Sequence, residues 1–65
     1  MAKVNGIERP DVDGGSLAEL LEKDGVDAAR VACELNGRIV PRDAYEATVL
    51  RADDALEVVR FVGGG

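Results

Sequence analysis

The clearest pattern of apolar positions marks a short helix in the first half of the chain. Three leucines recur at helical spacing and share one face: Leu17, Leu20 and Leu21. Ser16 and Glu19 have the spacing of a capping box, in which each side chain hydrogen-bonds a free backbone N–H of the first turn. Gly25 then supplies a stop, because glycine readily takes the left-handed conformation that ends many helices. The pattern predicts a helix of about seven to nine residues, which needs a sheet to pack against.

Two Asn-Gly pairs predict β-hairpins, one before this helix and one after it. Asn-Gly suits a type I′ turn because both central residues of that turn have positive φ. The pairs occupy residues 5–6 and 36–37. The predicted strand pairs are residues 2–4 with 7–12, and residues 30–35 with 38–40. Before the second turn, Val31, Cys33 and Leu35 alternate with other residues, which is the period of a strand with one buried face.

The last third of the chain begins at Pro41, which removes a backbone donor and ends the preceding strand. Residues 42–46 are expected to form one helical turn that folds Tyr45 back onto the core. A brief extended piece should follow at residues 48–50. Residues 56–62 are predicted to form the final strand, because apolar side chains dominate them.

The order of hairpin, helix, hairpin and final strand predicts an α+β fold. A helix that crosses one face of a mixed sheet buries its leucines together with the inward side chains of the strands. We therefore expect a β-grasp (ubiquitin-like) fold, a mixed sheet with one main helix packed on one face. Residues 1–62 would form the single domain, and residues 63–65 a flexible glycine tail.

Charge and composition narrow the classes of partner. The chain has 65 residues, 13 acids against 8 bases, a net charge of −5 and no histidine. The scattered bases argue against nucleic acid, and the acidic balance favours a basic protein surface. No apolar run approaches the roughly 20 residues of a membrane helix, and residues 1–6 do not resemble a signal peptide. We expect a cytoplasmic protein without a membrane partner.

Conventional catalytic and metal chemistry finds little support in the sequence. Without histidine, the chain lacks the usual general base and the commonest metal ligand. Cys33 is the only cysteine, and its place in the alternation points it into the core. Paired acids such as Asp11 and Asp13 are expected to be solvated turn residues, because we foresee no cleft that would separate their pKa values. We expect no catalytic residue, no metal site and no bound cofactor.

The remaining candidate for chemistry is the C-terminal run of Gly63, Gly64 and Gly65. It follows the last strand directly, so it would form a thread of about 10 Å on a rigid stem. A carboxylate becomes an acyl donor once ATP converts it to an acyl-adenylate, and a sulfur nucleophile can then displace AMP to leave a thiocarboxylate. Residues without side chains suit a narrow channel to a nucleotide in a partner enzyme. The alternative is a frayed end or a linker.

The final strand also suggests where a partner docks. By period-two alternation, Leu56 and Val58 share one face, and Val59 and Phe61 share the other. If the helix covers the Leu56 face, the other pair forms an apolar patch on the open face beside the tail. Such patches with an aromatic residue are typical of interaction sites. We expect Val59, Phe61 and Val62 to dock a partner; the alternative is that Phe61 only covers a sheet edge.

The chain resembles the ThiS family, the sulfur-carrier proteins of thiamine thiazole synthesis, over nearly its whole length. The resemblance is carried by Leu-Asn-Gly-Arg-Ile-Val-Pro-Arg at residues 35–42, by Tyr45, and by Glu-Val-Val-Arg-Phe-Val-Gly-Gly-Gly at residues 57–65. One departure is Ala-Asp-Asp at residues 52–54, where the family often has a glycine. That difference concerns the local turn geometry and not the function.

The resemblance implies that Gly65 is the modified residue and that Gly63 and Gly64 are required beside it. An E1-like enzyme of the ThiF type would adenylate Gly65 with ATP, and sulfur from a cysteine desulfurase would make the thiocarboxylate. Thiazole synthase, of the ThiG type, would take that sulfur. The chain would then be a carrier and not an enzyme. Two alternatives stay open: a carrier of another pathway, such as that of molybdopterin, or a non-covalent β-grasp interaction module.

Overall fold

Five strands form one mixed sheet in the order β2-β1-β5-β3-β4, in a computed structural model that describes residues 1–61. The strands are β1 (Lys3–Val4), β2 (Ile7–Glu8), β3 (Val31–Leu35), β4 (Arg38–Val40) and β5 (Ala55–Arg60). The two outer pairs are antiparallel hairpins. Between them, β5 runs parallel to β1 and antiparallel to β3. The last strand of the chain is therefore the central strand of the sheet.

Both Asn-Gly turns have the backbone that the sequence predicts. Asn5 and Asn36 have φ of 52° and 53°, and the glycine after each also has positive φ. The first hairpin is shorter than expected, since β2 ends at Glu8 and not at residue 12. Its end follows from Pro10, which has no N–H for the ladder and instead begins a 3₁₀ turn, η1 (Pro10–Val12).

The helix α1 (Leu17–Lys23) has the predicted ends. The Glu19 backbone N–H donates to Ser16 Oγ at 3.0 Å, and the Ser16 N–H donates to Glu19 Oε1 at 2.7 Å. These two bonds satisfy donors that the first turn of a helix would otherwise leave free. At the other end, Gly25 has φ of 69°, so the predicted stop is confirmed.

Two further 3₁₀ turns frame the second hairpin. The turn η2 (Ala28–Arg30) occupies the residue at which we expected β3 to begin, because the Asp27 side chain caps it by accepting from the Ala29 N–H. The turn η3 (Arg42–Ala44) follows Pro41, as predicted, and leaves Tyr45 only 4% exposed against the core. The fold is the predicted α+β arrangement with these additions.

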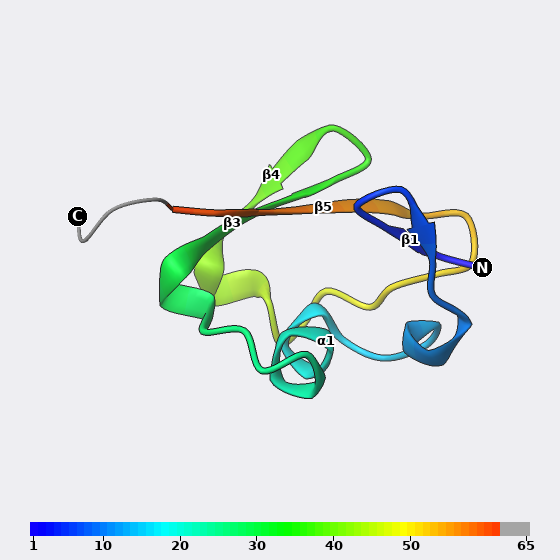
Figure 1. The fold of residues 1–65 in the computed structure, drawn as a ribbon, viewed down its shortest axis with the longest axis horizontal. Helices are drawn as coiled ribbons and strands as arrows, with labels where there is room; N and C mark the ends of the chain where they lie inside the picture. Colours follow the sequence, from blue (N-terminus) through cyan, green and yellow to red (C-terminus); the bar gives the residue numbers. More distant parts are fainter. Residues whose placement is uncertain (62–65) are drawn as a thin grey trace.

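The core lies between α1 and one face of the sheet, and the opposite face is left open (Figure 1). Its fully buried side chains come from the helix, from β3, from β5 and from the segment before β5: Leu17, Val31, Cys33, Leu50 and Leu56. In Figure 1 the C-terminal end of β5, in red, lies at the end of the molecule opposite the N-terminus. Among residues 1–61, no helix combines the length and the apolar character that crossing a membrane requires.

Candidate functional site

The end of β5 is held by pairing with β3, whereas β1 pairs only with Ala55 and Leu56 at the start of β5. Hydrogen-bonded pairing with β3 runs as far as Arg60, which lies opposite Val31. One residue further on, the Phe61 N–H donates to the Arg30 carbonyl oxygen at 3.0 Å. The stem that we predicted for the glycine run is thus anchored up to Phe61. The predicted tail residues Gly63, Gly64 and Gly65, and the predicted docking residue Val62, lie outside the described residues.

The two faces of β5 have the composition that alternation predicts. Leu56 is 1% exposed and packs in the core beneath α1, and Val58 is partly buried against that core. Val59 is 55% exposed on the open face, opposite Ala32 of β3, and Phe61 is 59% exposed. The face assignment is confirmed. The role of Phe61, docking or covering of a sheet edge, stays a prediction.

Neighbouring strands extend this open face beyond the residues that we predicted. Ala32 lies opposite Val59, on the strand that flanks β5. Glu34 lies opposite Glu57 one pair further along the same two strands. Ile39 of β4 lies opposite Glu34 and is 73% exposed. Ile39 was missed as a surface residue, although the alternation in its hairpin places it on the same face as Glu34.

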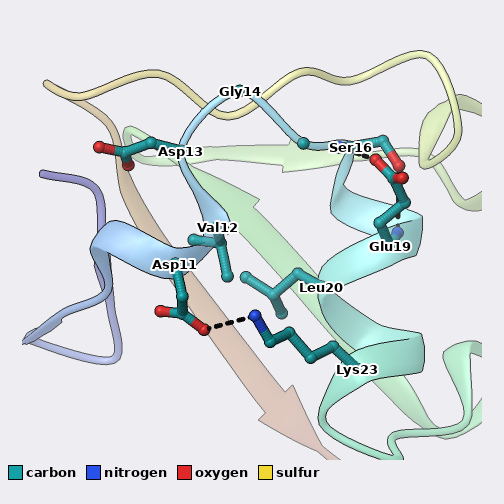
Figure 2. A pocket seen from close by; sticks show the side chains of 9 residues that line it. Asp11, Val12, Asp13, Gly14, Ser16, Glu19, Leu20 and Lys23 are labelled. Atoms are coloured by element: carbon teal, nitrogen blue, oxygen red, sulfur yellow. Dashed lines mark hydrogen bonds and ion pairs between the residues drawn. The ribbon is translucent and has the colours of Figure 1, made fainter.

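A surface cleft of about 440 Å³ lies at the start of α1, where we expected none, and three carboxylates line it (Figure 2). They belong to Asp11, Asp13 and Glu19. Asp13 accepts the backbone N–H of Ala2 at 2.8 Å and points away from the Asp11 side chain, while Glu19 is held in the capping box with Ser16. The expectation that no cleft would lie beside these acids was wrong. The Asp13 and Glu19 carboxylates nevertheless accept backbone N–H groups and do not form a catalytic pair.

The third carboxylate of the cleft belongs to a charge network centred on Arg9. The Arg9 guanidinium donates two hydrogen bonds to Asp11 and two to Asp24, at 2.9–3.0 Å. Lys23 adds an ion pair to Asp11 at 3.1 Å (Figure 2). The hydrogen bonds from Arg9 hold the pKa of Asp11 and that of Asp24 below the usual range of a carboxyl. The network fastens η1 to the C-terminal end of α1.

The single thiol is a core group, as predicted. Cys33 is completely buried on β3, and Tyr45 packs in the same cluster. Burial raises the pKa of the Tyr45 phenol, which therefore stays uncharged at neutral pH. Among residues 1–61, no three potential ligands of the His, Cys, Asp or Glu type come together to hold a metal ion. The open face beside the glycine run is therefore the candidate functional surface.

Comparisons with known proteins identify the family and the fold of this chain. The sequence model of the ThiS family matches residues 2–65. The chain is 32% identical over 66 residues to the sulfur carrier protein ThiS of Bacillus subtilis, covering 100% of both chains. A crystal structure of the thiamine biosynthesis protein ThiS from Geobacter metallireducens has a TM-score of 0.78 and 36% identity, covering 98% of this chain and 97% of that chain. The fold is thus the β-grasp fold of these proteins.

A second kind of relative is several times longer. The chain is 40% identical over 62 residues to the thiazole synthase of Paramagnetospirillum magneticum, which is 95% of this chain but 19% of the relative. The thiazole synthase of Magnetococcus marinus is 42% identical over 62 residues, with the same coverage. The chain therefore spans about a fifth of the length of these two synthases.

Proposed function

Because this chain belongs to the ThiS family, we propose that it is a sulfur carrier of thiamine thiazole synthesis whose reactive group is the C-terminal carboxylate of Gly65. The observation that carries this proposal is the family match, which extends through the glycine run to residue 65. The described structure supports it, because the strand that leads to the glycines is the central one of the sheet. A thread on such a stem can enter a partner while the folded body stays outside.

The proposed chemistry takes place in two substitutions. In the first, the Gly65 carboxylate attacks the α-phosphorus of ATP, and pyrophosphate leaves. In the second, a sulfur nucleophile attacks the carbonyl carbon, the bond to AMP breaks, and AMP leaves with that electron pair. With sulfide as the nucleophile no redox change is needed; sulfur delivered as a persulfide, from cysteine through a desulfurase, requires a thiol reductant. The product is the thiocarboxylate.

Two partners follow from these steps. An E1-like adenylating enzyme of the ThiF type would bind the ATP, so the carrier itself would hold no cofactor and catalyse no step. Thiazole synthase, of the ThiG type, would accept the sulfur. The similarity of this chain to a fifth of two thiazole synthases supports the second partner, since a carrier-like segment occurs within those proteins. All of these steps would take place in the cytoplasm.

We propose the open face of β5 as the docking surface for these partners. The exposed apolar groups at its end are Val59 and Phe61, and Val62 follows them in sequence. Apolar and aromatic side chains in the centre of an interface supply much of its affinity. Since the glycines have no side chains, recognition must come from the folded body, and this patch is the part of it nearest the tail.

Intact mass spectrometry tests the proposal directly. The purified chain is incubated with the adenylating enzyme of the same organism, ATP and sulfide. We expect the mass to rise by about 16 Da as one oxygen becomes sulfur. An unchanged mass, with the enzyme shown to be active on another carrier, would favour the non-covalent interaction module.

The pathway is tested separately with the charged form of the carrier. The thiocarboxylate is presented in parallel to thiazole synthase and to a molybdopterin synthase, and loss of its sulfur is followed by mass. We expect only thiazole synthase to take the sulfur. Transfer of sulfur to the molybdopterin synthase alone would show that the carrier belongs to the molybdopterin pathway.

A further inference from the structure

A small surface cleft lies where β5 ends, and basic side chains outnumber acidic ones in it although the whole chain is acidic. The cleft has a volume of about 280 Å³ and is lined by an apolar floor and by charged side chains from three segments. Its apolar residues are Val26, Val31 and Phe61, and its charged residues are Asp27, Arg30 and Arg60. The Phe61 N–H···O=C bond to Arg30 and the pairing of Val31 with Arg60 join the segments.

Two guanidinium groups flank this cleft against one carboxylate. The Asp27 carboxylate is already engaged, since it accepts from the Ala29 N–H at 2.9 Å and lies 3.7 Å from Arg30 Nε. Arg30 is nevertheless 83% exposed in its side chain. Arg60 has no carboxylate within ion-pair distance in the part of the chain that the structure describes. A chain of net charge −5 thus presents a locally basic cleft at the root of its tail.

With an extended tail, the arginines would lie far from the reacting carboxylate. Arg60 precedes Gly65 by five residues, so an extended tail separates them by up to about 17 Å. When Gly65 is at a partner's nucleotide, Arg30 and Arg60 would therefore lie at the entrance of the channel and not at the reacting groups. What they can recognise there is negative charge, because a guanidinium binds carboxylates in a planar two-bonded geometry.

We propose that Arg30 and Arg60 bind carboxylate side chains at the entrance of the adenylating enzyme's channel. This inference rests on the proposed function. The contact would set partner choice and the approach of the tail, because interfacial charge pairs act mainly on specificity and association rate. Lysine would serve less well, since it offers a point charge and no planar fork.

The test compares Arg60→Glu with Arg51→Glu. Arg51 is also exposed and lies before the start of β5, away from the tail, so both variants change the net charge equally. The rate of the 16 Da gain is measured at limiting carrier concentration. We expect Arg60→Glu to lower kcat/KM by about tenfold and Arg51→Glu to change it by less than about twofold. Arg60→Lys should recover part of the loss. Salt at 0.5 M should reduce the difference between the Arg60 and Arg51 variants, because the screening length is then only about 4 Å.

Arg30→Glu provides a second variant outside the sheet, should Arg60→Glu fail to fold, and the same loss is expected. Equal rates for the Arg60 and Arg51 variants would overturn the inference. Faster activation of Arg60→Glu would also overturn it, since the arginines would then hold back the chain's own terminal carboxylate. A wild-type chain that gains no mass would instead reject the proposed function. The two failures are therefore distinguishable.

Discussion

Ser16 is the side chain on which the start of α1 depends. Its hydroxyl accepts the Glu19 N–H, and the Glu19 carboxylate accepts the Ser16 N–H in return. We expect Ser16→Ala to lower the free energy of unfolding by about 1 kcal/mol, measured by urea denaturation. Ser16→Asp should keep most of the stability because aspartate also caps well. An alanine variant as stable as wild type would show that packing alone fixes the helix start.

The hydrogen bonds of Arg9 to two carboxylates should make the free energy of unfolding depend on pH. Its hydrogen bonds lower the folded-state pKa values of Asp11 and Asp24, so between the folded and unfolded pKa values the unfolded state binds more protons. The contribution of Arg9 is therefore complete above about pH 4 and is lost as the pH falls further. We expect Arg9→Ala to lower the urea midpoint at pH 7, and we expect this deficit to shrink progressively as the pH is lowered from about 4 to about 2.

The control for that experiment is Arg51→Ala, which removes an exposed arginine that has no ion pair within residues 1–61. Its urea midpoint should follow that of wild type at every pH. A deficit of Arg9→Ala that stays constant down to pH 2 would assign the effect to packing of the side chain and not to the two carboxylates.

Among single residues, those that act locally were predictable. The Ser16–Glu19 capping box and the positive φ angles of the Asn-Gly turns depend on residues within four positions, so the sequence alone reveals them. The asparagine side chains reach farther, since Asn5 Oδ1 accepts the Val58 N–H and Asn36 Oδ1 accepts the Ala55 N–H, and neither bond was predicted. Arg9 and Asp24 are 15 residues apart, and nothing in a local pattern joins them. The cleft with Asp11 and Asp13 was likewise unforeseen, because it exists only after η1 has packed against α1.

At the scale of elements, β5 places a buried side chain on one face and an exposed apolar side chain on the other, so substitutions on the two faces should have different effects. We expect Leu56→Ala to cost about 2–5 kcal/mol of unfolding free energy, because Leu56 fills the core. Phe61→Asp should leave stability within about 0.5 kcal/mol, since the ring is mostly exposed. The same Phe61 variant should slow tail activation at least about fivefold by removing an apolar contact.

Calorimetry and the mass assay on the same two variants check this division. A Phe61→Asp chain that melts well below wild type would place Phe61 in the core, and the alternative of an edge-covering residue would then hold. A Phe61→Asp chain that is both stable and fully active would remove Phe61 from the docking surface.

The elements themselves followed from pattern, but their ends and partners followed from tertiary structure. Leucine spacing and the two turns gave one helix and two hairpins. The ends of β2 and β3 moved because Pro10 and the Asp27 cap began 3₁₀ turns that short apolar patterns do not reveal. The nearness of Arg30 to Arg60 was equally hidden, since it depends on β3 pairing with β5 across 30 residues of sequence.

At the scale of the whole molecule, the two ends of the chain should differ in their tolerance of added residues. We expect one serine after Gly65 to abolish the mass gain while leaving the melting temperature unchanged, because the reactive carboxylate would be displaced. A short extension before Met1, which is 61% exposed, should preserve both. Full activity of the C-terminally extended chain would contradict the proposed use of Gly65.

The central position of β5 has a mechanical consequence. An enzyme that grips the glycines pulls on β5 along its own axis, and the load is shared in shear by the hydrogen bonds to β1 on one side and β3 on the other. In shear, those bonds must break together. The bonds of an edge strand that is peeled away would instead break one after another. The domain can therefore be drawn toward a deep site by its end without unravelling.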